Sequence, residues 1–167
     1  MMPPMINRFA ISVLLALICV GCSSTTEPTD TGSGTGTTLA NGSMSATIDG
    51  VAWTAAAITA TNSGGQVAIG ATSSSLLSIN LFFVVNGPGT YTVNSAISSF
   101  LVSQASTGAA STWTAVSGLA GSSGTVTFTT LTTTRAVGTF SGVVVANAGT
   151  AAVGTRTITN GRFDVRF

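Results

Sequence analysis

Residues 77–85 have the sequence LSINLFFVV, and large apolar side chains occupy every second position of this stretch. These positions are Leu77, Ile79, Leu81, Phe83 and Val85. A period of two places alternate side chains on opposite faces of a β-strand. We therefore predict a central strand with one face in the hydrophobic core. Because Phe82 and Val84 belong to the other face, we expect that face to be partly covered too.

The same alternation recurs towards the end of the chain. Val126 and Phe128 alternate with threonines, and Phe163 and Val165 alternate with charged residues. Turn-forming residues separate the apolar runs. The turn signals are Asp49-Gly50, Asn62 to Gly65, Asn86 to Gly89, Gly121 to Gly124 and Asn160-Gly161. No stretch has a convincing helical period, so we expect very little helix.

Eight to ten short strands around one core predict an all-β fold. The expected architecture is a single antiparallel β-sandwich, and the alternative is a small, lipocalin-like β-barrel. The difference matters for function, because a barrel can enclose a ligand cavity whereas side chains fill the space between the sheets of a sandwich.

The composition excludes most catalytic chemistry. The chain has 167 residues with five Lys+Arg, four Asp+Glu and no His, whereas 21 Ser and 29 Thr supply most of its polarity. No charged residue occurs from residue 50 to residue 134. General acid–base catalysis near pH 7 requires groups such as His, Glu, Asp or Lys. We therefore predict that this protein is not an enzyme.

Charge and cysteine content exclude other classes. A net charge of +1 does not provide the basic surface that nucleic-acid binding needs. Both cysteines, Cys19 and Cys22, lie in the first 22 residues, so the remaining chain has no cysteine for a disulfide or a metal site. We expect no metal, no cofactor and no nucleic-acid partner.

The N-terminus has the pattern of an export signal. Arg8 precedes the apolar run FAISVLLALICV at residues 9–20, which is shorter than the roughly 20 residues of a membrane-spanning helix. The segment ICVGC at residues 18–22 resembles the lipobox of bacterial lipoproteins, although Cys19 stands where an aliphatic residue is usual. The resemblance implies acylation of Cys22, and Ser23 after it implies sorting to the outer membrane, if the host has one. The alternative is an ordinary secretory signal cut elsewhere.

This pattern divides the chain into three parts. Residues 1–21 are the predicted lipoprotein signal peptide. Residues 22–42 are rich in Ser, Thr and Gly and form a predicted flexible tether. Residues 43–167 are the predicted all-β domain, which is the size of a unit with a single core.

Four short motifs in the predicted domain resemble a family of bacterial lipoprotein domains of unknown function. They are IDGVAW from Ile48, GTYTV from Gly89, GTFSG from Gly138 and ITNGRFDV from Ile158. The resemblance implies a secreted, lipid-anchored, all-β domain. It brings no assigned activity and no catalytic residues.

The candidate ligand-binding residues are few. Arg156, Arg162 and Arg166, together with Asp164, form the main charge cluster, and guanidinium groups there could bind a carboxylate or another anion. The alternative is a solvated strand face whose charges protect a sheet edge. Trp113 could present an exposed ring to a sugar, or it could pack in the core.

The sequence thus predicts a non-enzymatic, exported protein held at the cell envelope by acyl chains on Cys22. Its β domain would serve for binding or structural duty, with a protein or glycan partner. The alternative is a carrier of a small apolar or sugar-like ligand inside a β-barrel, and a third hypothesis is an adhesive or assembly module.

Overall fold

The computed structural model describes residues 41–93 and 97–167, which contain eleven strands and no helix. The strands are β1 Gly42–Ile48, β2 Val51–Thr54, β3 Ala57–Ser63, β4 Gln66–Thr72, β5 Leu77–Val84, β6 Gly89–Thr92, β7 Ser99–Gln104, β8 Ser111–Val116, β9 Ser123–Leu131, β10 Arg135–Ala146 and β11 Thr155–Arg166. Cys19, Cys22, the predicted signal peptide and almost all of the predicted tether lie outside the described residues. In the described part, no helix has the length and apolar character needed to span a bilayer.

All strand pairs are antiparallel and belong to one curled sheet. The main path runs β2-β1-β11-β10-β8-β7-β5-β4-β3, and β9 and β6 branch from it at β10. The branch arises because β10 is long: residues 136–143 pair with β9, whereas Val145 and Ala146 pair with β8. The sheet therefore folds over at β10 into two facing halves.

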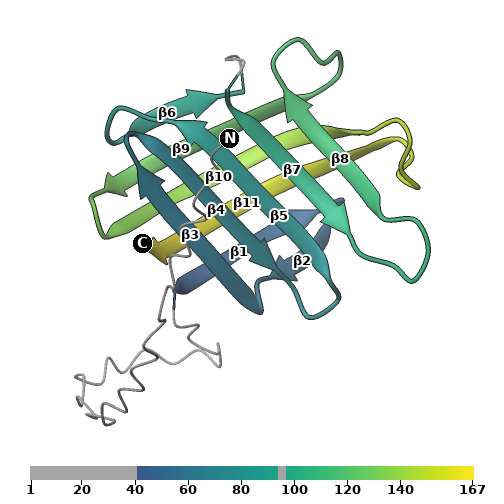
Figure 1. Cartoon of the computed structure of the whole chain (residues 1–167), viewed down its shortest axis with the longest axis horizontal. Helices are drawn as coiled ribbons and strands as arrows, with labels where there is room; N and C mark the ends of the chain where they lie inside the picture. Colours follow the sequence, from purple (N-terminus) through teal and green to yellow (C-terminus); the bar gives the residue numbers. More distant parts are fainter. Residues whose placement is uncertain (1–40, 94–96) are drawn as a thin grey trace, which may run out of the picture. The chain divides into compact units, whose positions relative to one another are not determined.

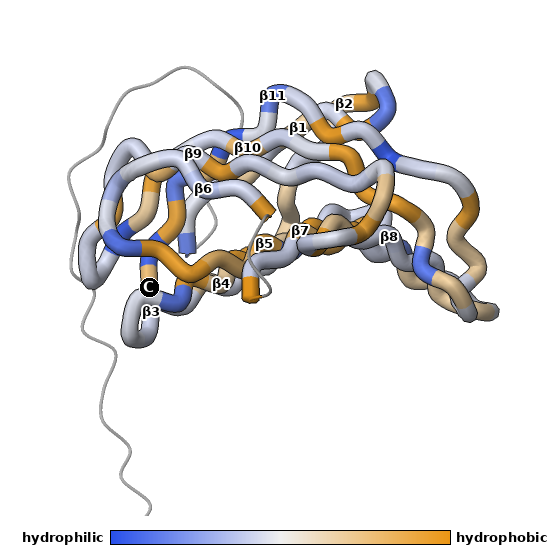
Figure 2. Tube along the Cα trace, turned by 90° about the horizontal axis from the view of Figure 1, so that it is seen from above, coloured by the Kyte–Doolittle hydropathy of each residue, from blue (hydrophilic) through white to orange (hydrophobic). Residues whose placement is uncertain are grey.

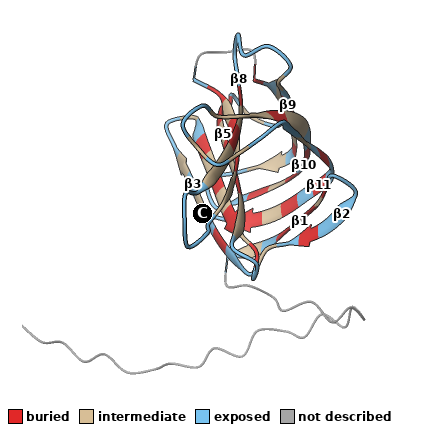
Figure 3. Ribbon diagram, turned by 90° about the vertical axis from the view of Figure 1, so that its right-hand side faces the viewer, coloured by how far each residue is buried: buried red, intermediate tan, exposed pale blue. Residues whose placement is uncertain are grey.

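We call these halves the β10 layer and the β5 layer. The β10 layer contains β6, β9, β10, β11, β1 and β2, and the β5 layer contains β3, β4, β5, β7 and β8. The strands of the two layers cross in Figure 1, and the buried residues in Figure 3 face the space between the layers. The predicted all-β antiparallel fold is confirmed. The described residues contain eleven strands rather than eight to ten, because β2 and β6, with four residues each, add short segments.

One cluster of buried apolar side chains fills the space between the layers. The alternation predicted for residues 77–85 is confirmed, since Ile79, Leu81 and Phe83 of β5 are at most 3% exposed. The aromatic rings that could have lined a ligand cavity contact one another in this core, with Phe100 and Phe140 centroids 5.8 Å apart. Figure 2 shows that the most hydrophilic residues occupy only short segments of the trace.

Two reciprocal Phe–Gly pairs join β10 to β11. Gly138 lies opposite Phe163, and Phe140 lies opposite Gly161. A Cβ atom on Gly161 would lie 2.6 Å from the ring of Phe140, and one on Gly138 would lie 2.6 Å from the ring of Phe163. Glycine in a strand interior allows such close approach. The GTFSG and ITNGRFDV motifs are therefore cross-strand partners whose rings occupy the space over each other's glycines.

The predicted turn at Asn160-Gly161 is wrong. These residues lie inside β11, where the register shifts against both β10 and β1. Asn160 has a φ of 53°, which Asn tolerates better than most residues. The pair forms a β-bulge, a one-residue insertion that changes which face the following side chains occupy. By contrast, Asp49-Gly50 forms the predicted turn between β1 and β2.

The two layers are also joined by a tryptophan hydrogen bond. Trp53 on β2 is 5% exposed, and its Nε1 donates to the carbonyl oxygen of Leu77 on β5 at 3.0 Å. The bond connects the end strand of the β10 layer to the middle of the β5 layer.

Candidate functional site

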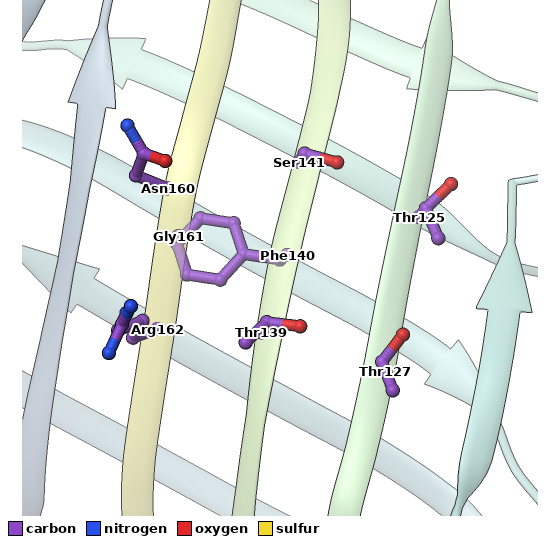
Figure 4. Close-up of a pocket in the computed structure, with 8 residues that line it drawn as sticks. All are labelled: Thr125, Thr127, Thr139, Phe140, Ser141, Asn160, Gly161 and Arg162. Carbon is purple, nitrogen blue, oxygen red and sulfur yellow. The ribbon is translucent and has the colours of Figure 1, made fainter.

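A shallow depression of about 290 Å³ lies on the outer face of the β10 layer. Its lining comes from three neighbouring strands: Thr125 and Thr127 of β9, Thr139, Phe140 and Ser141 of β10, and Asn160, Gly161 and Arg162 of β11. Figure 4 shows the hydroxyl, amide and guanidinium groups projecting from these strands. Four hydroxyls, one amide and one guanidinium therefore surround a single concave surface.

The strand register places the polar side chains of the depression in a row. Thr127 lies opposite Thr139, and Thr139 lies opposite Arg162. The row extends beyond the depression to Thr90 on β6, whose Oγ1 is 2.9 Å from Oγ1 of Thr127, and to Ser45 on β1. Adjacent strands lie about 4.8 Å apart, so the row forms a regular polar line across five strands.

The position of this row follows from local sequence. On β9 the inward residues are Val126 and Phe128, so Thr125 and Thr127 point outward. On β10, buried Phe140 separates Thr139 from Ser141, which are both exposed. The two Phe–Gly pairs lie directly beneath, since they pair residues adjacent to those that form the polar row.

The bulge in β11 decides which arginines share this face. Arg162, Asp164 and Arg166 alternate with buried Phe163 and Val165, so these three side chains share the outer face of β11. Arg156 lies before the bulge, two residues from buried Ile158. Its side chain therefore starts from the same face as Ile158, the inner face of the sheet. The predicted four-residue charge cluster is therefore divided between two faces.

Asp164 on the outer face is paired with Arg135 of β10. The Nε and Nη2 atoms of Arg135 donate to the two carboxylate oxygens at 2.8 and 2.6 Å. These hydrogen bonds hold the pKa of Asp164 below its usual value, and they raise the pKa of Arg135. The carboxylate is thus ionised at neutral pH and is already occupied by a guanidinium.

Arg162 and Arg166 remain without an ion-pair partner in the part of the chain that the structure describes. The described residues contain four arginines and two aspartates, and both aspartates are taken by Arg135 and Arg156. The outer face of β11 therefore carries two exposed guanidinium groups that form no ion pair, with Asp164 between them, and Arg162 lines the depression. Asp164 also interacts electrostatically with Arg166.

Arg156 is held at a different place, near the turn between β1 and β2. Its Nη1 donates to Oδ2 of Asp49 at 2.8 Å, and its guanidinium carbon lies 4.5 Å from the centroid of the Trp113 ring. Oδ1 of Asp49 accepts the backbone N–H of Thr157 at 2.7 Å. Both aspartate oxygens are engaged, and the guanidinium packs on an aromatic face.

The pKa of Asp49 reflects two opposing causes. Partial burial acts to raise the pKa, but the hydrogen bonds from Thr157 and Arg156 and the positive charge of Arg156 outweigh it, so the net pKa lies below 3.8. Asp49 also has a φ of 49° in its turn. Its turn role is as predicted, but its carboxylate bonds to β11 rather than to its own backbone.

Trp113 is 3% exposed and its Nε1 donates to the carbonyl oxygen of Val153 at 3.1 Å. Of the two alternatives that the sequence left open for Trp113, the structure shows the ring packed in the core and not the ring exposed to a sugar. The cause is the fold of the sheet at β10: Trp113 pairs with Ala146 and points into the core under the loop that precedes β11.

The two aspartates of the described residues, Asp49 and Asp164, bond to different arginines, Arg156 and Arg135. Within residues 41–93 and 97–167, no three His, Cys, Asp or Glu side chains gather in one place. The hydroxyl and amide groups of the depression can form hydrogen bonds with a neutral ligand, and Arg162 can attract an anion.

Sequence reasoning missed most of the depression. It identified Arg162, but not the outward hydroxyls of β9 and β10 or the amide of Asn160. Two signals could have found them: the Thr-Xaa-Thr/Ser spacing on consecutive strands, and the glycines within strand patterns, which indicate a bulge or a close backbone approach.

No protein-family model, curated protein or solved structure matches this chain. The resemblance of its motifs to lipoprotein domains stays a prediction. In the structure these motifs form the turn between β1 and β2, strand β6, and the paired segments of β10 and β11.

Proposed function

We propose that this protein is an exported, lipid-anchored, non-enzymatic binding protein of the cell envelope. Acyl chains on Cys22 hold it at a membrane, and Ser23 favours the outer membrane. The β domain then presents its outer face to a partner. The observation that carries this proposal is the allocation of charge: both carboxylates of the described domain are engaged by arginines, while a polar depression with a free guanidinium faces outward.

Binding fits this surface better than catalysis does. A catalytic acid or base must exchange a proton with its substrate, and its pKa usually lies near the working pH. The pKa of Asp164 is instead lowered by Arg135, and the pKa of Asp49 is lowered by the backbone N–H of Thr157 and by Arg156. Hydroxyls and an amide, by contrast, can donate and accept hydrogen bonds without any change of charge.

The anchor is supported by the ICVGC segment and by the physics of acylation. A single acyl chain gives only marginal membrane attachment, whereas several chains together give stable attachment. A multiply acylated Cys22 would therefore hold the protein without using any surface of the β domain.

Labelling with radioactive palmitate tests the anchor. We expect incorporation into the wild-type protein and into Cys19→Ala, the matched cysteine control, and loss of label in Cys22→Ala. Equal incorporation into wild type and Cys22→Ala would overturn the anchor.

A screen of hydrolase substrates tests the absence of catalysis. We expect no turnover above background with the purified full chain. Robust turnover that Asp49→Asn or Asp164→Asn abolishes would overturn the proposal that the protein is non-enzymatic.

A further inference from the structure

We infer that the outer face of β9, β10 and β11 binds an acidic polysaccharide, a sugar chain that carries carboxylates. This inference rests on the proposed binding function and names its ligand class. The depression would hold one sugar unit of the chain, with Arg162 on a carboxylate and the surrounding hydroxyls on the ring hydroxyls. Arg166 would bind a second carboxylate further along the chain.

The first argument is charge complementarity. Both carboxylates of the described domain are occupied, and the two arginines that lack a partner share one face of β11. Four residues along a strand span about 13 Å, so Arg162 and Arg166 are too far apart to share one small anion. A polymer with repeated carboxylates can reach both.

The second argument is the set of polar side chains that surround Arg162 in the depression. Thr125, Thr127, Thr139 and Ser141 present hydroxyls, and Asn160 presents an amide, all towards the depression. Sugar hydroxyls both donate and accept hydrogen bonds, as Ser, Thr and Asn side chains do. The row continues to Thr90 and Ser45 across the neighbouring strands, so it meets the line from Arg162 to Arg166 at Arg162.

The third argument separates a polysaccharide from an anionic membrane surface. Protein surfaces that insert into the membrane interface combine basic residues with exposed Trp, Phe or Leu. The exposed large apolar residues of the described domain are Val51, Leu76, Ile97, Val116, Leu119 and Val153, and none of them belongs to β9, β10 or β11. This face therefore lacks the apolar side chains that a lipid surface would take up.

The test measures binding of the purified full chain, kept in detergent micelles, to polygalacturonate. Dextran serves as the neutral polysaccharide. Phosphatidylglycerol vesicles serve as the lipid probe and are offered, without detergent, to the full-length Cys22→Ala variant, so that acyl chains do not contribute to the binding. We expect binding to polygalacturonate only, and weaker binding as ionic strength rises from about 0.01 to 0.15 M, where the screening length falls from about 30 to 8 Å.

Variants locate the site. Arg162→Gln and Arg166→Gln should each weaken binding about fivefold at low salt, the upper range for an exposed ion pair. Thr139→Val should weaken it about threefold through one neutral hydrogen bond. Thr61 is exposed on β3 of the other layer. Thr61→Asp lowers the net charge by as much as each arginine change, and Thr61→Val removes a hydroxyl, so both controls should retain wild-type affinity.

Three outcomes would overturn the inference. They are equal binding by wild type and the Arg162→Gln/Arg166→Gln double variant, equal binding of dextran and polygalacturonate, and arginine-dependent binding of vesicles without binding of polygalacturonate. Palmitate incorporation, measured on the same preparation, reports the anchor separately. Dextran binding that Thr139→Val weakens would leave the proposed binding function standing and remove only the acidic ligand.

Discussion

Substitution of Gly161 by alanine tests the packing that supports the depression. Gly161 lies opposite Phe140, and its φ is not positive, so the expected cost is steric rather than conformational. The new methyl group would overlap the carbonyl oxygen of Phe140 and would lie 2.6 Å from two atoms of its ring.

The magnitude follows from this overlap. Carbon atoms in contact prefer separations of about 3.5–4.0 Å, so the ring or the strand must move by about 1 Å. The ring has little room, because Phe140 also packs against Phe100 and Phe163 with centroid separations of 5.8 and 6.4 Å. Overpacking of this kind costs about 1–3 kcal/mol. For a domain of this size we expect the melting temperature to fall on the order of 5–10 °C.

Thermal and urea denaturation of the full chain, followed by circular dichroism, measure this loss. Gly108→Ala is the matched control, because no atom lies within 4 Å of its added Cβ and its φ is not positive. That variant should keep its stability within about 0.5 kcal/mol. If Gly161→Ala were as stable as Gly108→Ala, the account of the Phe–Gly pairs would be refuted.

Three further predictions concern other contacts. The free energy of unfolding should fall as the pH falls below 3.8, because the lowered pKa of Asp49 gives stability that is present above that value and is lost on protonation. Urea titrations at several pH values measure this dependence, and Asp49→Asn should reduce it. The same dependence of the unfolding free energy on pH in wild type and Asp49→Asn would contradict this reasoning. Trp53→Phe should cost about 0.5–1.5 kcal/mol in the same assay through the lost indole hydrogen bond, because the Leu77 carbonyl keeps the N–H and the hydroxyl of Ser73 as donors. A neutral result would show that the indole bond contributes little. Thr114→Val should raise the free energy of unfolding by about 1 kcal/mol and increase the melting temperature, because Thr114 Oγ1 is buried without a hydrogen-bond partner among the described residues. A lower melting temperature would refute that reasoning.

The fold class could be predicted because its signal is local. Alternation at Ile79, Leu81 and Phe83 reports one buried face regardless of the strands alongside, and Asp49-Gly50 specifies a tight turn by backbone geometry alone. The junction of the two layers has no such local signal. It depends on β10 being long enough to pair with β9 and then with β8, and the residues from 135 to 146 do not specify those partner strands.

The candidate site was predicted less well, and Asn160-Gly161 explains why. In isolation this pair favours a hairpin turn, but pairing of β11 with strands on both sides keeps the chain extended and leaves a bulge. Because a bulge reverses the parity of the strand, Arg156 and Arg162 lie on opposite faces although they are an even number of residues apart. The sequence left open whether Trp113 is buried or exposed, because the partner of its indole N–H is the Val153 carbonyl, 40 residues further along the chain.

The first strand also determines how the domain would bear mechanical load. The chain enters β1 at Gly42, and β1 lies between β2 and β11. Asn41 accepts a backbone hydrogen bond from Arg166, and Ser45 lies opposite Arg162. Asn41 also donates from Nδ2 to the carbonyl oxygen of Ile58 on β3 at 3.0 Å. Tension between the N-terminal segment and a polymer held at Arg162 would therefore pass mainly through a few rungs of the β1–β11 pair, with one side-chain contact to the β5 layer.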